Sequence, residues 1–97
     1  MFNNERYITS GIGDELSPTL QAILWSMIDE MDVPEKDHLQ VFTLSGSGNR
    51  QVIIHEQEQP KYKQEHRLTL VGTPIFVGKI FVIDDGDHST MLKASEY

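Results

Sequence analysis

The stretch IFVIDDGDHSTML, residues 80–92, decides the fold that this sequence predicts. Apolar and β-branched residues stand on both sides of Asp85 and Gly86, a pair that accepts the positive φ angles of a type I′ turn. We therefore expect a β-hairpin with Asp85 and Gly86 at its tip, which places Asp84 opposite Asp87. Because like charges directly across a ladder are destabilising, a cation, a basic side chain or a partner is expected beside them.

One amphipathic helix is predicted upstream of this hairpin. Ser17 can cap it, Pro18 suits the first helical position, and Pro34 follows its expected end. Apolar residues recur at helical spacing and form a single stripe: Leu20, Ile23, Leu24, Met27, Ile28 and Met31.

The rest of the chain has the pattern of short strands. They are expected near residues 6–10, 39–44, 51–55, 66–71, 75–77 with 79–84, and 87–92, and residues 11–13 are expected to form a turn. Phe42 and Leu44 should share one face of the sheet with Val52 and Ile54. The sequence thus predicts a single α+β domain over residues 1–97, with the helix packed on a largely antiparallel sheet of about five or six strands in two layers.

Composition narrows the classes of function. The chain has 97 residues, a formal net charge of −7 and no cysteine, so disulfides and thiol chemistry are excluded. An acidic surface repels phosphate backbones, which disfavours nucleic-acid binding. No signal peptide is visible, and no apolar run approaches the roughly 18 residues of a membrane span. We expect a cytoplasmic protein that binds neither nucleic acid nor membrane.

The acidic hairpin is the best candidate for a metal site. Carboxylates of Asp84 and Asp87 suit Mg²⁺, Mn²⁺ or Ca²⁺, and His88 would favour a transition metal. The spacing is not that of an EF-hand loop. A solvated turn, for which Asp and Gly are common residues, is the alternative. No cofactor is predicted other than this divalent cation.

A second candidate surface lies on the helix. Trp25 falls about 140° from Leu20 on the helical wheel, outside the apolar stripe, where a large aromatic can anchor a partner. Asp29, Glu30 and Asp32 crowd the helix end, where negative charge opposes the helix dipole and hints at a basic partner. The alternatives are that Trp25 packs against the sheet edge or the N-terminal segment, and that the acids are simply solvated.

Several segments together resemble a known family. They are Arg6-Tyr7, Leu20-Gln21 with Leu24-Trp25 and Ile28-Asp29, residues 39–42 (LQVF), residues 57–60 (QEQP) and, most specifically, residues 80–92. The sequence is similar to the uncharacterised Firmicutes family called domain of unknown function 960. That resemblance implies a bacterial cytoplasmic protein and supplies no catalytic residue.

No catalytic constellation emerges from the sequence. The leading hypothesis is a non-catalytic protein-interaction or regulatory accessory module that binds another protein, as a monomer or homodimer, through Trp25, Asp29, Glu30 and Asp32. The alternative is a divalent-cation-binding protein or small metal-dependent enzyme that uses Asp84, Asp87 and His88.

Overall fold

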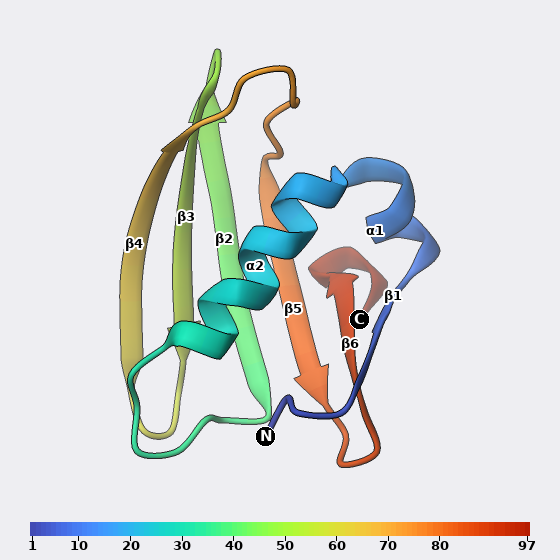
Figure 1. Ribbon diagram of the computed structural model, residues 1–97, viewed down its shortest axis with the longest axis vertical. Coiled ribbons are helices and arrows are strands. Elements are labelled where there is room, and N and C mark those ends of the chain that lie inside the picture. Colours follow the sequence, from blue (N-terminus) through green and yellow to red (C-terminus); the bar gives the residue numbers. More distant parts are fainter.

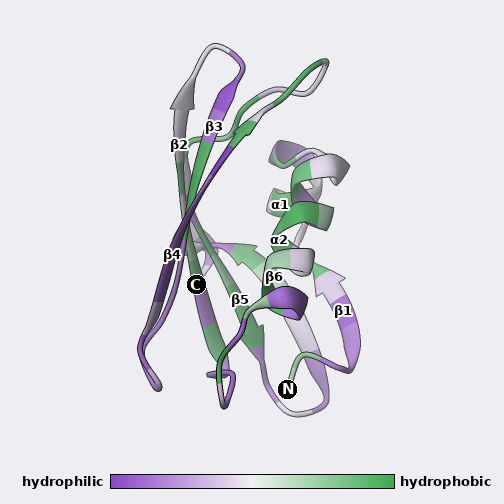
Figure 2. Cartoon of the chain, turned by 60° about the vertical axis from the view of Figure 1, so that its left-hand side comes forward, coloured by the Kyte–Doolittle hydropathy of each residue, from purple (hydrophilic) through white to green (hydrophobic).

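Helix α2 (Pro18–Glu30) lies across one face of a six-stranded sheet in the computed structural model, which describes residues 1–97 (Figure 1). Both α-helices sit on this side of the sheet, and no helix covers the opposite face (Figure 2). The other elements are, in chain order, β1 (Glu5–Ile8), α1 (Ser10–Glu15), β2 (Leu39–Ser47), β3 (Arg50–Gln57), β4 (Tyr62–Thr69), β5 (Gly78–Asp84), β6 (His88–Lys93) and a 3₁₀ turn (Ala94–Glu96).

The strands follow the spatial order β1-β6-β5-β2-β3-β4. Every neighbouring pair is antiparallel except β1 and β6, which are parallel. The predicted α+β class, with one main helix on a largely antiparallel sheet, is confirmed. β1 and β4 form the two edges of the sheet.

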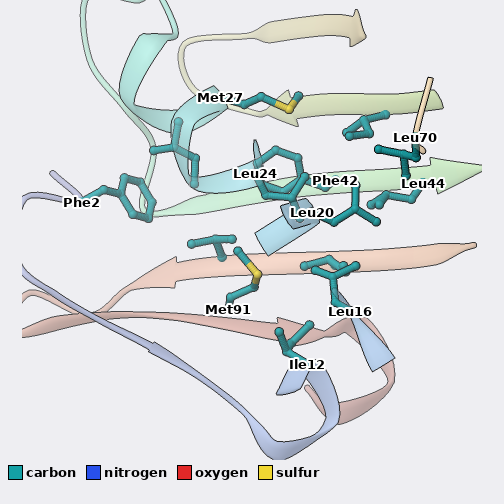
Figure 3. Close-up of a cluster of buried hydrophobic side chains, with 14 residues drawn as sticks. Phe2, Ile12, Leu16, Leu20, Leu24, Met27, Phe42, Leu44, Leu70 and Met91 are labelled. Atoms are coloured by element: carbon teal, nitrogen blue, oxygen red, sulfur yellow. The ribbon is translucent and has the colours of Figure 1, made fainter. Parts of the chain in front are cut away.

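The α2 helix forms where the sequence predicts it. The side-chain oxygen of Ser17 accepts a hydrogen bond from the Leu20 N–H, and Pro18 begins the helix. The stripe is buried against the central strands, where Leu24 and Met27 lie near Phe42 (Figure 3). Burial of each such side chain contributes about 1.5–3 kcal/mol, so packing fixes the helix on the sheet.

Residues 11–13, predicted to form a turn, instead lie in the short helix α1. The Thr9 hydroxyl accepts a hydrogen bond from the Ile12 N–H at 3.3 Å and caps this helix. Ile12 is fully buried in the core. The two glycines that flank Ile12 disfavour a helix by propensity, and tertiary packing of Ile12 overrides that local preference.

The predicted pairing of β2 with β3 was wrong by one residue. Phe42 lies opposite His55 and Leu44 opposite Ile53, so Val52 and Ile54 point to the helix-free face. The strands extend beyond the predicted 39–44 and 51–55, to Ser47 and Arg50, and leave a tight turn between them. Because side chains alternate along a strand, a shift of one residue exchanges the two faces.

β4 begins earlier than predicted. The predicted strand began at residue 66, yet residues 62–65 also pair with β3, from Gln57 opposite Tyr62 onward. Residues 75–77 form no strand, and β5 begins at Gly78. None of the helices is long and apolar enough to cross a membrane.

Candidate functional site

The β5–β6 hairpin turns one residue later than the sequence predicts. Asp84 lies opposite Ser89, and the Asp85 N–H donates to the His88 carbonyl at 3.1 Å. Oδ1 of Asp85 accepts hydrogen bonds from the N–H groups of Asp87 and His88, both at 3.1 Å. This Asx-type contact makes Asp85 the first residue of the turn, so Asp84 and Asp87 do not face each other.

Asp84 is buried and holds the N-terminal segment. Its carboxylate accepts from the Phe2 N–H at 2.6 Å, from Asn4 Nδ2 at 3.1 Å and from the Gly86 N–H at 2.8 Å. Burial opposes the charge, but these hydrogen bonds outweigh it and lower the pKa of Asp84. The compensation expected for this carboxylate is thus supplied by backbone and amide donors.

The structure does not bring the three proposed metal ligands together. Asp87 is exposed at the tip of the hairpin, whereas Asp84 points into the protein. His88 Nε2 lies 3.1 Å from Asp85 Oδ2, and its ring meets Tyr7 edge-on. No group of three or more His, Asp or Glu side chains is placed to hold a metal ion. The divalent-cation hypothesis stays a prediction with no geometric counterpart in this fold.

Replacing Asp84 with Ala should lower the free energy of unfolding by about 2–4 kcal/mol, because the buried Phe2 N–H and the half-buried Asn4 amide would lose their acceptor. The matched variant Asp87→Ala removes an exposed carboxylate and should change the free energy of unfolding by less than about 0.5 kcal/mol. Urea denaturation measures both. Equal effects of the two substitutions would contradict this assignment.

Trp25 and Asp29 are engaged within the chain. The guanidinium of Arg6 lies 4.7 Å from the centre of the Trp25 ring and hydrogen-bonds both carboxylate oxygens of Asp29. The hydrogen bond from Arg6 lowers the pKa of Asp29. Trp25 itself is half-buried and packs against the core. Arg6 therefore ties the first strand to α2 through these two side chains.

Glu30 and Asp32 have no such partner. Both are exposed, and neither makes an ion pair in the structure, which leaves two free carboxylates at the end of α2. They line a groove of about 480 Å³, here called the α2–β4 groove. Its lining residues are Ser26, Met27, Glu30, Met31, Asp32, Tyr62, Gln64 and His66.

The α2–β4 groove combines an apolar floor with polar walls. Met27 and Met31 are buried within it. Burial raises the pKa of the Tyr62 hydroxyl, and the nearby carboxylate of Asp32 raises it further. Nε2 of His66 is buried without a hydrogen-bond partner. The β4 wall of the groove was not predicted from the sequence, because the polar residues 62–65 lack the apolar alternation typical of a strand.

A buried polar network lies beside this groove. The His55 ring is fully buried, stacks on Phe42 at 4.4 Å between ring centres and meets Tyr62 edge-on at 5.2 Å. His55 Nε2 lies 2.7 Å from Gln40 Oε1, and Gln40 Nε2 donates to Gln57 Oε1 at 2.7 Å. Burial, with a smaller contribution from His66, lowers the pKa of His55 to about 4.

This shift predicts a loss of stability on acidification. In the unfolded chain His55 returns to its ordinary pKa of 6.5, so between pH 6.5 and 4 the unfolded state binds more protons. The contribution of His55 to the free energy of unfolding is complete above pH 6.5. It falls by about 3 kcal/mol as the pH decreases to 4. Urea denaturation between pH 6.5 and 4 should show a smaller decrease in the free energy of unfolding for His55→Gln than for the wild-type protein. Parallel pH profiles of the two proteins would contradict the lowered pKa of His55.

Comparison with known proteins places this chain in a family. Residues 5–96 match the family described as "Staphylococcal protein of unknown function (DUF960)". The chain belongs to the DUF960 family. The DUF960 fold recurs in a solved structure described as the crystal structure of a protein of unknown function from Enterococcus faecalis. The two share 24% sequence identity and a TM-score of 0.80, over 98% of this chain and 92% of the other. No curated protein matches the sequence.

Proposed function

We propose that this DUF960 protein is a non-catalytic interaction module of the bacterial cytoplasm, acting as an accessory or regulatory factor, and that its α2–β4 groove receives a basic segment of another protein. The observation that carries the proposal is the pair of carboxylates, Glu30 and Asp32, at the rim of a groove with no internal cation.

The contrast with a neighbouring residue supports this assignment. Asp29 precedes Glu30 in the sequence, yet its carboxylate is bound by Arg6 on the other side of α2. Glu30 and Asp32 receive no equivalent guanidinium or ammonium. A basic side chain of another protein could bind Glu30 and Asp32 at the groove, as the Arg6 guanidinium binds Asp29 on the opposite side of the helix.

The groove chemistry fits a lysine or arginine side chain. The alkyl stem of such a residue can lie on Met27, Met31 and the Tyr62 ring while its charged head meets the carboxylates. Methionine side chains adapt to ligands of varied shape, which suits a surface that recognises a flexible segment. A small anionic ligand would instead face two carboxylates at the rim.

Charge at this end of the molecule favours the same partner. The α2–β2 loop and the β3–β4 turn lie at the same end as the termination of α2 (Figure 1). The β3–β4 turn carries Glu58 and Lys61 and is neutral, whereas the α2–β2 loop carries Asp32, Glu35 and Asp37 against Lys36 alone and is acidic. A net negative charge increases the rate of encounter with a positively charged partner and makes that rate depend on salt.

Neutral isosteres test the role of the rim. The double variant Glu30→Gln, Asp32→Asn keeps side-chain size, so it should fold normally but lose most binding to a hexa-arginine peptide, measured by NMR titration. The wild-type protein should show chemical-shift changes at Met27, Met31, Tyr62 and His66. We expect the dissociation constant to rise about tenfold or more, since each charge-assisted contact contributes about 1 kcal/mol.

Asp14→Asn is the matched control, because Asp14 is exposed on α1 and makes no ion pair. It removes a similar carboxylate outside the groove and should leave peptide binding nearly unchanged. Equal losses in Asp14→Asn and the double variant, or shift changes spread over all acidic surfaces, would show non-specific attraction and contradict the proposal. Capture of partners from a cell extract should show the same difference between variants.

A further inference from the structure

The outer edge of β4 is the longer of the two edges of the sheet. β4 has eight residues and β1 has four. An edge strand presents a row of N–H and C=O groups that can pair with another strand. β4 contains no proline and no bulge along its register with β3. Its backbone can therefore accept a further strand along its length.

Backbone direction limits how a second copy of β4 could pair with the first. The Leu70 N–H donates to the Asn49 carbonyl at 2.7 Å, in line with the β3–β4 register. Since hydrogen-bonding directions alternate along a strand, the outward groups of β4 belong to Lys63, Glu65, Arg67 and Thr69. Two antiparallel copies must therefore pair odd-numbered residues with odd-numbered residues, about an axis through one residue.

The charges on β4 distinguish between these axes. An axis at Glu65 would place Glu65 opposite itself and Lys63 opposite Arg67, and an axis at Arg67 would place Arg67 opposite itself. An axis at Gln64 would pair Glu65 with Lys63, but it would also bring Arg67 opposite Lys61, which immediately precedes β4. Like charges directly opposite are destabilising, so each of these arrangements is disfavoured.

An axis at His66 places no like charges opposite each other within β4. Glu65 of each copy lies opposite Arg67 of the other, and Lys63 lies opposite Thr69. Within one chain Arg67 Nε already lies 2.6 Å from Glu65 Oε2, so four alternating charges would meet on the helix-free face. We propose that two copies of this chain pair through their β4 edges, antiparallel and with His66 on the two-fold axis, to form one continuous sheet.

The helix-side face of β4 is compatible with this pairing. The two His66 residues would lie beside each other on the axis, and Gln64 of each copy would lie opposite Leu68 of the other, so no like charges meet on this face. α2 runs toward β4 and ends before it reaches the free edge of that strand (Figure 1).

Charge-reversal variants test the pairing by sedimentation velocity. The wild-type chain should be a dimer, and Glu65→Lys or Arg67→Glu alone should weaken it roughly 30-fold, because both symmetry-related pairs become repulsive. The double variant Glu65→Lys, Arg67→Glu restores opposite charges and should dimerise again. An equimolar mixture of the two single variants should form a heterodimer. Lys79→Glu, which makes the same charge change on β5, is the control and should leave the dimer intact.

Amide hydrogen exchange gives a second readout that does not depend on substitution. Dilution of the wild-type protein should expose the N–H groups of Glu65 and Arg67, while those of Gln64 and His66 stay protected by β3. A wild-type chain that is monomeric at millimolar concentration would overturn the proposal, since the charges would then only guard the edge. A dimer that survives every reversal would overturn it as well, because another surface would hold the copies together.

Discussion

The limited reach of α2 across the sheet determines most of this structure. A helix of 13 residues extends about 20 Å, and six strands are spread over about 24 Å between the outer two. α2 covers the centre of the sheet, and α1 packs against β6 near the other edge. The inner face of β4 is left partly bare. Both the α2–β4 groove and the open β4 edge follow from that incomplete cover.

The polar network next to the groove follows from the same constraint. Where α2 ends, the buried face of β3 changes from Ile53 to His55, which packs against Phe42 and Tyr62, and then to Gln57, which contacts the α2–β2 loop. The Gln57 side chain accepts from the Asp37 N–H and donates to the carbonyl oxygens of Glu35 and Pro60. One amide side chain thereby ties the α2–β2 loop to the β3–β4 turn. The acidic loop is consequently held in place beside the groove.

The sequence was sufficient for the fold class and for α2, because both depend on strong local patterns. Ser17 and Pro18 mark the start of α2, and its apolar stripe is buried as predicted. The failures arose where local preference and packing disagree. α1 was not predicted because it contains two glycines, which disfavour a helix, and because Ile12 is its one buried residue.

Site prediction failed for a related reason. The position of the β5–β6 turn depends on the Asp85 side chain, and the role of Asp84 depends on a contact with Phe2, 82 residues away. Neither contact leaves a local pattern. Of the residues predicted to bind a partner, Glu30 and Asp32 line a groove, whereas Trp25 and Asp29 are bound by Arg6. The alternation of Tyr62, Gln64, His66 and Leu68 was the available signal for β4, but their polar character concealed it.

Three tyrosines allow the central claim, that the α2–β4 groove is the partner-binding surface, to be tested directly. Tyr62 lines the groove, Tyr7 lies on the β1 edge, and Tyr97 is exposed beside Phe81 on the helix-free face. Replacing each in turn with the photoreactive analogue p-benzoylphenylalanine and irradiating living cells would show which surface meets another protein. The account predicts a cross-link from position 62 to a lysine- or arginine-rich segment of a different protein. Cross-links to a different protein from positions 7 or 97, with none from position 62, would contradict it.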